Sequence, residues 1–461
     1  MIAPVAVFDL GKTNSKMFVF SPEGEILDEQ REAPAWRNHE GFRVLDDARL
    51  ESWMRAALGK AVTEYGVEGV MVSGHGCTFA LVSGDRLTYP ILDYEQEPPE
   101  DIAAKIDALI PSFSETYSPR LPMGFNFGRH ILWLENVRPD VLEASQYILG
   151  YPQFWTWRFS GTAVSERSYL GCHSHLWAPL RNDFSSLVDQ RGWREKMPPF
   201  VRAGEVVGDT RIALPAGEAR TLAVHNAVHD SNSSLYCYRA AGHDSFTLIS
   251  SGTWVVIFNS ECPFSLLDEE RDMLANVSVD GAPVPTIRFM GGREFDTIRE
   301  GASPRVSRES LQAVIDRRLF ALPSFAPGGP SQETRGEITG AIGSDVERAA
   351  LALLYVTLMS DYCLDLIGSR NTIIVDGGLV KTGAYAEVLA QLRPEQKVLS
   401  SDNPEGSAVG AAALAFEALG GKPRPVECSV TVPSELRGLV EYRAEWRDKV
   451  EERRQKARSR S

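Results

Sequence analysis

The sequence predicts a mixed α/β protein of two lobes built on the same plan, and two observations support this prediction. At 461 residues the chain is too long for one ordinary domain. An apolar strand, a short polar turn and a second apolar strand occupy residues 5–20, and the same design recurs at residues 245–258. Two such hairpins, about 240 residues apart, indicate a repeat at the scale of domains. We therefore expect one lobe at residues 1–242 and another at residues 243–461.

The rest of the first lobe mixes helices and strands. Apolar residues recur at helical spacing from Leu50 to Tyr65, and Gly66 follows as a stop signal. A short apolar strand at residues 68–76 ends in glycines. Residues 112–200 are rich in aromatic residues and proline but show little periodicity, which predicts inserted loops and helices around a binding cleft.

The second lobe continues in the same way after its hairpin. Its pattern predicts a long apolar helix at residues 346–368, a strand at residues 372–378 and a helix starting near Ala384. Small residues dominate a further helix at residues 405–419, which suits close packing against a sheet. The stretch at residues 449–461 is charged, and we expect it to be a solvated or frayed tail.

Composition and charge favour a globular protein with a small-molecule partner. The formal net charge of −14 argues against a nucleic-acid-binding surface. The longest apolar run, Leu351 to Met359, has about half the length of a membrane span, and no signal peptide is evident. The six cysteines form no CxxC pair and are expected to be reduced. We expect a cytoplasmic protein with no nucleic-acid partner and no membrane span, and we leave open whether it is a homodimer.

The segment Gly11-Lys12-Thr13 raises the question of a P-loop. A P-loop needs a glycine five residues before Gly11, where this chain has Ala6, and a helix after the threonine. Residues 16–20 instead form an alternating, β-prone run. The P-loop interpretation therefore fails, and the segment is predicted to be a strand, a polar turn and a strand.

The same turn still has features that suit phosphate binding. Gly11 permits a tight turn, Thr13, Asn14 and nearby amides can face phosphate oxygens, and Lys16 can supply charge. Gly252 and Thr253 occupy the equivalent turn of the second hairpin. A surface hairpin with polar tip residues is the alternative for either turn alone.

Glycines after a buried strand add a third candidate, because they let a flat ligand approach the backbone closely. Gly377 and Gly378 stand at that place, directly after Asp376. Three such turns in this order are much more specific than one.

The sequence argues against two other types of site. The segment from Gly74 to Phe79 lacks the third glycine of a dinucleotide-binding fingerprint. Cys172, His173 and His175 have the residue types of a zinc site, but no second ligand pair follows at suitable spacing.

The order of the motifs resembles the FGGY carbohydrate kinases over residues 5 to about 420. The matching segments are DLGKTNSK (9–16), HDSNSS (229–234), ISSGTW (249–254), VDGGLVKTGAYAEVLA (375–390) and EGSAVGAAALA (405–415). HDSNSS and ISSGTW look most like the rhamnulokinase and fuculokinase branch. This resemblance implies two ribonuclease-H-like lobes, as in actin and the heat-shock ATPases, with ATP and Mg²⁺ bound in the cleft between them.

The resemblance also implies roles for individual residues. Asp230 matches the catalytic aspartate, and a base is what the chemistry requires, because a sugar hydroxyl that attacks the γ-phosphorus loses its proton. The first phosphate element comprises Asp9, Gly11, Thr13, Asn14 and Lys16, and the second comprises Gly252 and Thr253. Gly377 and Gly378 match the adenosine motif. The resemblance assigns sugar binding to His75, Gly76, Asp93 and His229, and the holding of Mg²⁺ through water to Asp9 and Asp230. His75 is expected to donate a hydrogen bond to a sugar hydroxyl, although a purely structural histidine is the alternative.

Two departures from the family pattern concern specificity. Many members carry Trp-x-Asp-x-Arg in the sugar site, whereas this chain reads Leu92-Asp93-Tyr94-Glu95-Gln96 and lacks the arginine. Thr382 stands where an asparagine commonly follows the adenosine glycines. The expected reaction is phosphorylation of a ketose, L-rhamnulose or L-fuculose at C1 in the first instance. The alternatives are another pentulose, ketohexose or polyol as substrate, or a sensing or transporter-associated protein without turnover.

Overall fold

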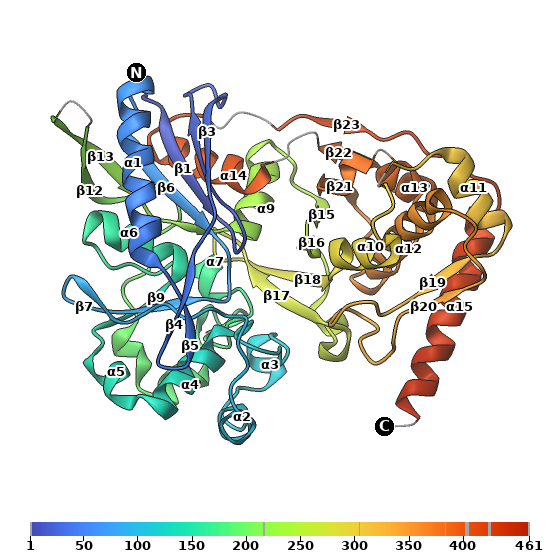
Figure 1. Cartoon of the computed structure of the whole chain (residues 1–461), viewed down its shortest axis with the longest axis horizontal. Coiled ribbons are helices and arrows are strands. Elements are labelled where there is room, and N and C mark those ends of the chain that lie inside the picture. Colours follow the sequence, from blue (N-terminus) through green and yellow to red (C-terminus); the bar gives the residue numbers. More distant parts are fainter. Residues whose placement is uncertain are drawn as a thin grey trace. The chain divides into compact units, whose positions relative to one another are not determined.

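The computed structural model describes residues 2–214, 217–303, 305–382, 384–401, 405–422 and 426–459. The chain divides into two compact units (Figure 1). The first comprises Met1–Gly242, Ala275–Pro283 and Gly406–Pro425. The second comprises His243–Leu274, Val284–Glu405 and Val426–Ser461.

A seven-stranded sheet forms the centre of the first unit. Its strand order is β12-β13-β6-β1-β2-β3, and β14 also pairs with β6. The strands are β1 (Val5–Leu10), β2 (Ser15–Phe20), β3 (Ile26–Glu32), β6 (Gly69–Gly74), β12 (Val206–Ala213), β13 (Ala219–His225) and β14 (Val228–His229). β1 and β2 form the predicted hairpin, in which Val5 lies opposite Phe20 and Leu10 opposite Ser15.

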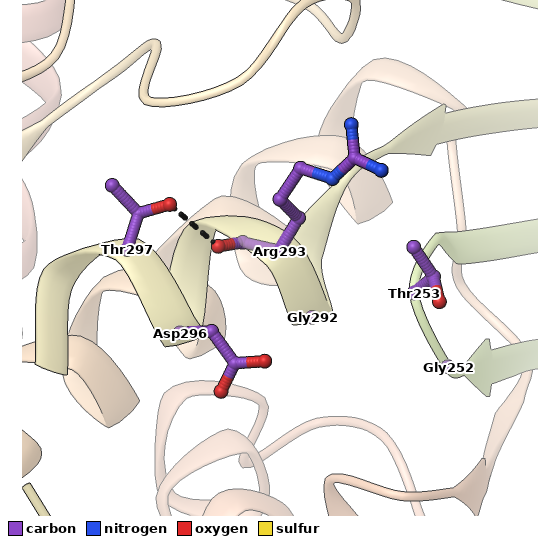
Figure 2. Close-up of a pocket in the computed structure, with 6 residues that line it drawn as sticks. All are labelled: Gly252, Thr253, Gly292, Arg293, Asp296 and Thr297. Carbon is purple, nitrogen blue, oxygen red and sulfur yellow. Dashed lines mark hydrogen bonds between the residues drawn. The ribbon is translucent and has the colours of Figure 1, made fainter. Parts of the chain in front are cut away.

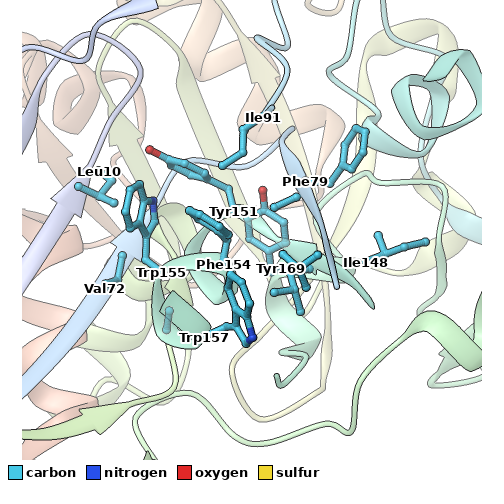
Figure 3. Close-up of a cluster of buried hydrophobic side chains, with 14 of the residues drawn as sticks. Leu10, Val72, Phe79, Ile91, Ile148, Tyr151, Phe154, Trp155, Trp157 and Tyr169 are labelled. Carbon is cyan, nitrogen blue, oxygen red and sulfur yellow. The ribbon is translucent and has the colours of Figure 1, made fainter. Parts of the chain in front are cut away.

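The central strand β1 is buried on both faces, which explains its continuous apolar run. Ala6, Phe8 and Leu10 belong to one apolar cluster, part of which Figure 3 shows. Val5 and Val7 point to the opposite face and belong to another cluster, together with residues of α14 (Gly406–Ala418).

Helix α1 (Asp47–Tyr65) confirms the helix predicted at Leu50–Tyr65. The Asp46 side chain accepts a hydrogen bond from the Arg49 amide at the start of the helix. Gly66 ends the helix in the left-handed conformation, with φ of 66°.

The other elements of the first unit surround the central sheet or extend it. Residues 112–200 form short helices, and β7, β8 and β9 form a small separate sheet. The remaining elements are α2 (Glu100–Asp107), α3 (Phe113–Thr116), α4 (Phe127–Val137), α5 (Pro139–Ala144), α6 (Tyr151–Ser160), α7 (Arg167–Leu170), α8 (Ser186–Gln190), α9 (Asp230–Ala240), β4 (Trp36–His39), β5 (Phe42–Leu45), β7 (Phe79–Ser83), β8 (Arg86–Tyr89), β9 (Tyr147–Gly150), β10 (Trp177–Ala178) and β11 (Asp183–Phe184).

Helix α14 has the small residues that the sequence predicts, but it lies in the first unit. It packs beside α9 (Figure 1) and against β1 and β6. A Cβ on Gly410 would lie 1.9 Å from the Ser233 carbonyl oxygen, so only glycine permits this approach of the two helices. The second unit is therefore not the continuous stretch 243–461 that the sequence predicts.

A second seven-stranded sheet, of order β17-β18-β16-β15-β21-β22-β23, belongs mainly to the second unit, although Ala275–Val277 of β17 and Pro283 of β18 fall in the first. Its strands are β15 (Phe246–Ser251), β16 (Val255–Asn259), β17 (Met273–Val277), β18 (Pro283–Phe289), β21 (Thr372–Gly377), β22 (Val398–Ser401) and β23 (Cys428–Val430). The helices and the small strand pair of this unit are α10 (Gly291–Arg299), α11 (Arg308–Asp316), α12 (Asp345–Leu366), α13 (Tyr385–Leu392), α15 (Leu439–Arg458), β19 (Phe320–Leu322) and β20 (Glu337–Thr339). β15 and β16 are the predicted second hairpin.

Within the described part of the chain, α12 is the helix that is long and apolar enough to cross a membrane by length and composition. In its most apolar window 89% of the residues are buried inside the protein. A core helix of a globular protein has this same character.

The prediction of a solvated tail at residues 449–461 is wrong for its described part, because residues up to Arg458 belong to α15. Trp446, Val450 and Arg454 recur every four residues on one face of this helix and are at most 2% exposed. The Arg454 guanidinium is paired with Glu333 at 2.6 Å. The tail is therefore an amphipathic helix whose buried stripe includes one paired arginine.

Candidate functional site

Three neighbouring parallel strands of the first unit end at the same edge of the sheet. Leu10 and His229 both lie opposite Gly74, because β1 and β14 each pair with β6 in parallel. The His75 amide donates to the Leu10 carbonyl oxygen at 3.1 Å. The turns that follow these strands carry Gly11, His75 and Asp230, so the structure brings together predicted residues that are distant in sequence.

Asp230 is the first residue of α9, and its side chain is 31% exposed. Its Oδ1 accepts hydrogen bonds from the Ser231 amide at 2.5 Å and from the Ser231 hydroxyl at 3.1 Å. These bonds fix the carboxylate at the edge of the sheet, where it remains accessible to a ligand.

His229 is buried and contacts Asp230. Its Nδ1 accepts a hydrogen bond from the Asn232 side-chain amide at 3.0 Å, so its Nε2 carries the proton. Nε2 lies 3.3 Å from Asp230 Oδ1 and 3.2 Å from Cys172 Sγ. Burial lowers the pKa of His229, while the charge of Asp230 acts in the opposite direction. The geometry thus makes His229 a neutral partner of Asp230.

His75 is also neutral near pH 7, because burial lowers its pKa to about 4. Its Nδ1 lies 2.7 Å from the Gly76 carbonyl oxygen, which can only accept. Nδ1 therefore carries the proton and Nε2 is left as an acceptor. The expected donation from His75 to a sugar hydroxyl is thus wrong in its direction, since a hydroxyl would donate to Nε2. The ring stacks on Tyr151 with 4.6 Å between centroids.

Gly76 leaves little room for a side chain. A Cβ at this position would lie 3.0 Å from His229 Nε2 and 3.3 Å from Cys172 Sγ.

The first predicted phosphate element is a tight turn. The Gly11 amide donates to the Asn14 carbonyl oxygen at 3.0 Å, and a Cβ on Gly11 would lie 2.8 Å from that oxygen. Thr13 and Asn14 are exposed at the tip. Asp9 Oδ2 accepts a hydrogen bond from Ser407 at the start of α14, at 2.9 Å, and Lys16 lies opposite Asp9 in the strand ladder.

Asp93 is completely buried and forms ion pairs with two cations. Lys12 contacts its Oδ1, and Arg43 Nη1 lies 3.2 Å from its Oδ2. Arg43 belongs to β5, so an arginine reaches this aspartate although none stands two residues after it in the sequence. Sequence spacing along the 92–96 segment carries no signal of this arrangement.

The second hairpin and the glycines of the adenosine motif also meet at one edge. β15 and β21 are parallel neighbours, with Ser251 opposite Gly377. The Gly378 amide donates to the Ser251 carbonyl oxygen at 2.7 Å. Gly377 has a φ of 92°, and a Cβ on it would lie 2.0 Å from that oxygen. Gly252 and Thr253 follow Ser251 directly, so the two predicted elements are adjacent.

An open pocket of about 500 Å³ lies beside the second turn (Figure 2). It is lined by Gly252, Thr253, Gly292, Arg293, Asp296 and Thr297. The last four belong to α10, whose first amides and Arg293 guanidinium are groups that bind anions. Sequence reasoning missed these four residues. A signal was present, because Gly291-Gly292 follows strand β18 after one residue, Met290, and opens a helix.

Thr382, which replaces the common asparagine, uses its hydroxyl within its own turn. Thr382 Oγ1 donates to the Leu379 carbonyl oxygen at 2.7 Å.

Gly292→Ala is expected to weaken ATP binding on the order of tenfold, about 1.4 kcal/mol. A Cβ at this position would lie 2.2 Å from the Gly252 carbonyl oxygen and 3.2 Å from Thr253 Cα, so the phosphate turn must shift. Gly252→Ala is the matched comparison, because its Cβ would meet its nearest atom at 3.9 Å. Titration with ATP by calorimetry should show the larger loss for Gly292→Ala, and equal losses would contradict the steric argument.

The residues with zinc-ligand character have other partners. His173 Nδ1 bonds to the Phe125 carbonyl oxygen at 2.8 Å, and His175 Nε2 bonds to the Ser118 carbonyl oxygen at 3.2 Å. Among the described residues no group of three or more His, Cys, Asp or Glu side chains is placed to hold a metal ion.

Comparisons with known proteins identify a family model and solved structures that this chain resembles. The family model "Carbohydrate kinase FGGY, C-terminal domain" matches residues 243–423. A carbohydrate kinase from Novosphingobium aromaticivorans is 33% identical, with 98% of this chain and 99% of that chain covered and a TM-score of 0.87. A search of the curated proteins gives no match.

More distant solved structures share the fold. A xylulose kinase from Lactobacillus acidophilus is 14% identical, covers 98% of this chain and 99% of that chain, and has a TM-score of 0.77. A gluconate kinase from the same organism is also 14% identical, covers 99% of both chains, and has a TM-score of 0.78.

Proposed function

Because the chain belongs to the FGGY carbohydrate kinase family and is an ATP-dependent sugar kinase, we propose that its acceptor is a ketose, phosphorylated at the primary C1 hydroxyl. L-rhamnulose and L-fuculose are the first candidates, because HDSNSS and ISSGTW resemble the branch that uses 6-deoxy-ketohexoses. Xylulose follows, as the substrate named for a structure with the same fold.

The observation that carries this proposal is the position of Asp230. Its carboxylate lies at the edge where β1, β6 and β14 end, and His229 Nε2 is 3.3 Å from its Oδ1. A base at this place takes the proton of the attacking hydroxyl as the bond to the γ-phosphorus forms. His229 is then a neighbour of this carboxylate, and its ring is held by hydrogen bonds with Asn232 at Nδ1 and Cys172 at Nε2.

His75 supports the binding of a polyhydroxy substrate at the same edge. Its bare Nε2 is an acceptor for a sugar hydroxyl, and the orientation of the ring is fixed by the bond to Gly76 and the stacking on Tyr151. Burial lowers the pKa of His75 to about 4, so the imidazole is neutral and keeps this acceptor near pH 7.

ATP is assigned to the second unit. The β15–β16 turn and the first turn of α10 offer backbone amides and Arg293 to phosphate oxygens, and Gly377 and Gly378 offer a surface without side chains to the adenosine. Mg²⁺ would neutralise charge on the phosphates. Asp9 and Asp230 fit it, because this ion prefers oxygen ligands and is usually bound through one or two carboxylates, water and substrate phosphates.

Purified protein should phosphorylate one member of a panel that contains L-rhamnulose, L-fuculose, D-xylulose, other ketoses, polyols and gluconate. We expect ATP-dependent turnover of a ketose, with ³¹P and ¹³C NMR placing the phosphate on C1. Turnover restricted to a polyol or to gluconate would overturn the ketose assignment. ATP binding without turnover of any member would favour the sensing role instead.

A further inference from the structure

Lys12 lies in the first phosphate turn by sequence, but its side chain is held elsewhere. Its Nζ contacts the buried carboxylate of Asp93. The same ammonium lies 3.6 Å from the centroid of a Trp36 ring and 4.9 Å from that of Tyr94. The side chain is only 13% exposed, so these contacts fix its position.

The surroundings of Asp93 prevent it from offering its carboxylate directly to a ligand. Oδ1 contacts Lys12 and accepts a hydrogen bond from the Glu95 amide at 2.9 Å. Oδ2 lies 3.2 Å from Arg43 Nη1, and the side chain is fully buried. Asp93 therefore acts on a ligand only through the cations that cover it.

Lys12 is close to the residues assigned to the sugar. Tyr94 contacts Lys12 through its ring face, and its ring centroid is 5.3 Å from that of His75. Burial is the main cause of the low pKa of His75, but the charge of Lys12 also lowers it and that of Asp230 raises it. Lys12 and Asp230 are thus each within electrostatic reach of His75.

We propose that Lys12 is a specificity-determining residue that contacts the sugar, and that Asp93 and Arg43 are positioning residues that hold its ammonium. This inference rests on the proposed function, because it concerns the acceptor site of the same reaction. Lys12 donates hydrogen bonds and His75 Nε2 accepts them, so a hydroxyl between them satisfies both. The pair therefore binds one hydroxyl of a polyhydroxy compound.

The local charges favour a neutral sugar over a sugar acid. Lys12 and Arg43 are balanced by Asp93 and by Glu95, whose Oε2 lies 3.9 Å from Lys12 Nζ. A carboxylate brought to this site would gain no net attraction and would lose its hydration. The substrate class is therefore an uncharged polyhydroxy compound, which includes the proposed ketose.

Lys12→Met tests this role in the full-length enzyme with the ketose that the wild type uses. We expect the KM for the sugar to rise about 10- to 100-fold, as for the loss of a hydrogen bond to a charged group, with the KM for ATP little changed. Lys16→Met is the matched comparison, because Lys16 is assigned to phosphate, and it should raise the KM for ATP instead. A Lys12→Met enzyme with an unchanged KM for the sugar, or with only its ATP kinetics altered, would overturn the inference.

Removing Lys12 also leaves Asp93 with one cation fewer, so stability needs its own control. The double variant Lys12→Met with Asp93→Asn removes the buried charge together with its partner. It should fold like the wild type by thermal melting and keep the raised KM for the sugar. Recovery of the wild-type KM in the double variant would show that Lys12 acts only structurally.

A binding readout separates this inference from the proposed function. Sugar that contacts Lys12 should change the fluorescence of Trp36 in the absence of ATP, and Trp36→Phe should abolish this change. A ketose that alters the fluorescence of the wild type but not of Lys12→Met, without being phosphorylated, would support Lys12 and contradict the kinase assignment of the ketose. Binding of gluconate in preference to every ketose would overturn the neutral-sugar class.

Discussion

Replacing Asp230 with asparagine should lower kcat about 10²- to 10⁴-fold, because the amide cannot accept the proton of the sugar hydroxyl. The shape of the side chain is retained, and the Ser231 amide and hydroxyl can still donate to its oxygen. The KM for the sugar and the affinity for ATP should therefore change little. Steady-state kinetics with the preferred ketose and calorimetry with ATP measure the two parts separately.

Asp209→Asn is the matched control for this variant, because Asp209 is exposed on strand β12 of the same unit and is not among the predicted site residues. It should have wild-type kcat. An Asp230→Asn enzyme with wild-type kcat would show that another group accepts the proton, whereas a loss of ATP affinity of similar size would indicate a role in holding Mg²⁺.

Asp361→Ala should lower the free energy of unfolding of the second unit by about 3 to 5 kcal/mol. Asp361 is fully buried on α12, with Arg393 Nε 2.7 Å from its Oδ1 and Arg447 paired with its Oδ2. Arg393 follows α13 and Arg447 lies on α15, so this carboxylate connects three helices. Its loss leaves the Arg393 guanidinium, which is 7% exposed, with an incomplete set of partners.

Asp365→Ala is the control for the buried position. Asp365 lies 2.6 Å from Arg393 Nη1 and from Arg447 Nη1, but its side chain is 37% exposed. Solvent screens its ion pairs, so the loss should be clearly smaller. Urea unfolding followed by circular dichroism gives both values, and equal losses for the two variants would show that burial does not set the cost.

Local patterns determined the elements that sequence analysis recovered. In the β1–β2 and β15–β16 hairpins, two strands rich in apolar residues flank a short polar turn. In α1, apolar residues recur at helical spacing between an N-cap residue and a terminating glycine. Asp230 was predicted as the base because its motif stands in the order of the family it resembles, whereas its proximity to His229 Nε2 depends on the fold. The ketose and the role of each predicted site residue remain predictions.

The missed elements had weaker local signals. The repeat of Trp446, Val450 and Arg454 in α15 was present in the sequence. An arginine is expected to be exposed, however, and the sequence does not show that Glu333 pairs with Arg454 and allows its burial. Gly292 was not singled out, because nothing in the sequence shows that the Gly252 carbonyl will approach it.

The sequence by itself determined the local elements of this protein, namely two hairpins, a buried helix and glycine turns, and the order of its motifs resembles that of the FGGY carbohydrate kinases. These features depend on residues near one another along the chain, where spacing reports conformation. Only the tertiary structure decided that α14 packs with the first unit and that Arg43 pairs with Asp93. It also decided that the Lys12 ammonium, which follows Gly11 in the predicted phosphate turn, contacts Trp36 and Tyr94. Those outcomes depend on contacts between distant segments, whose steric fit and charge pairing are fixed only when the chain has folded.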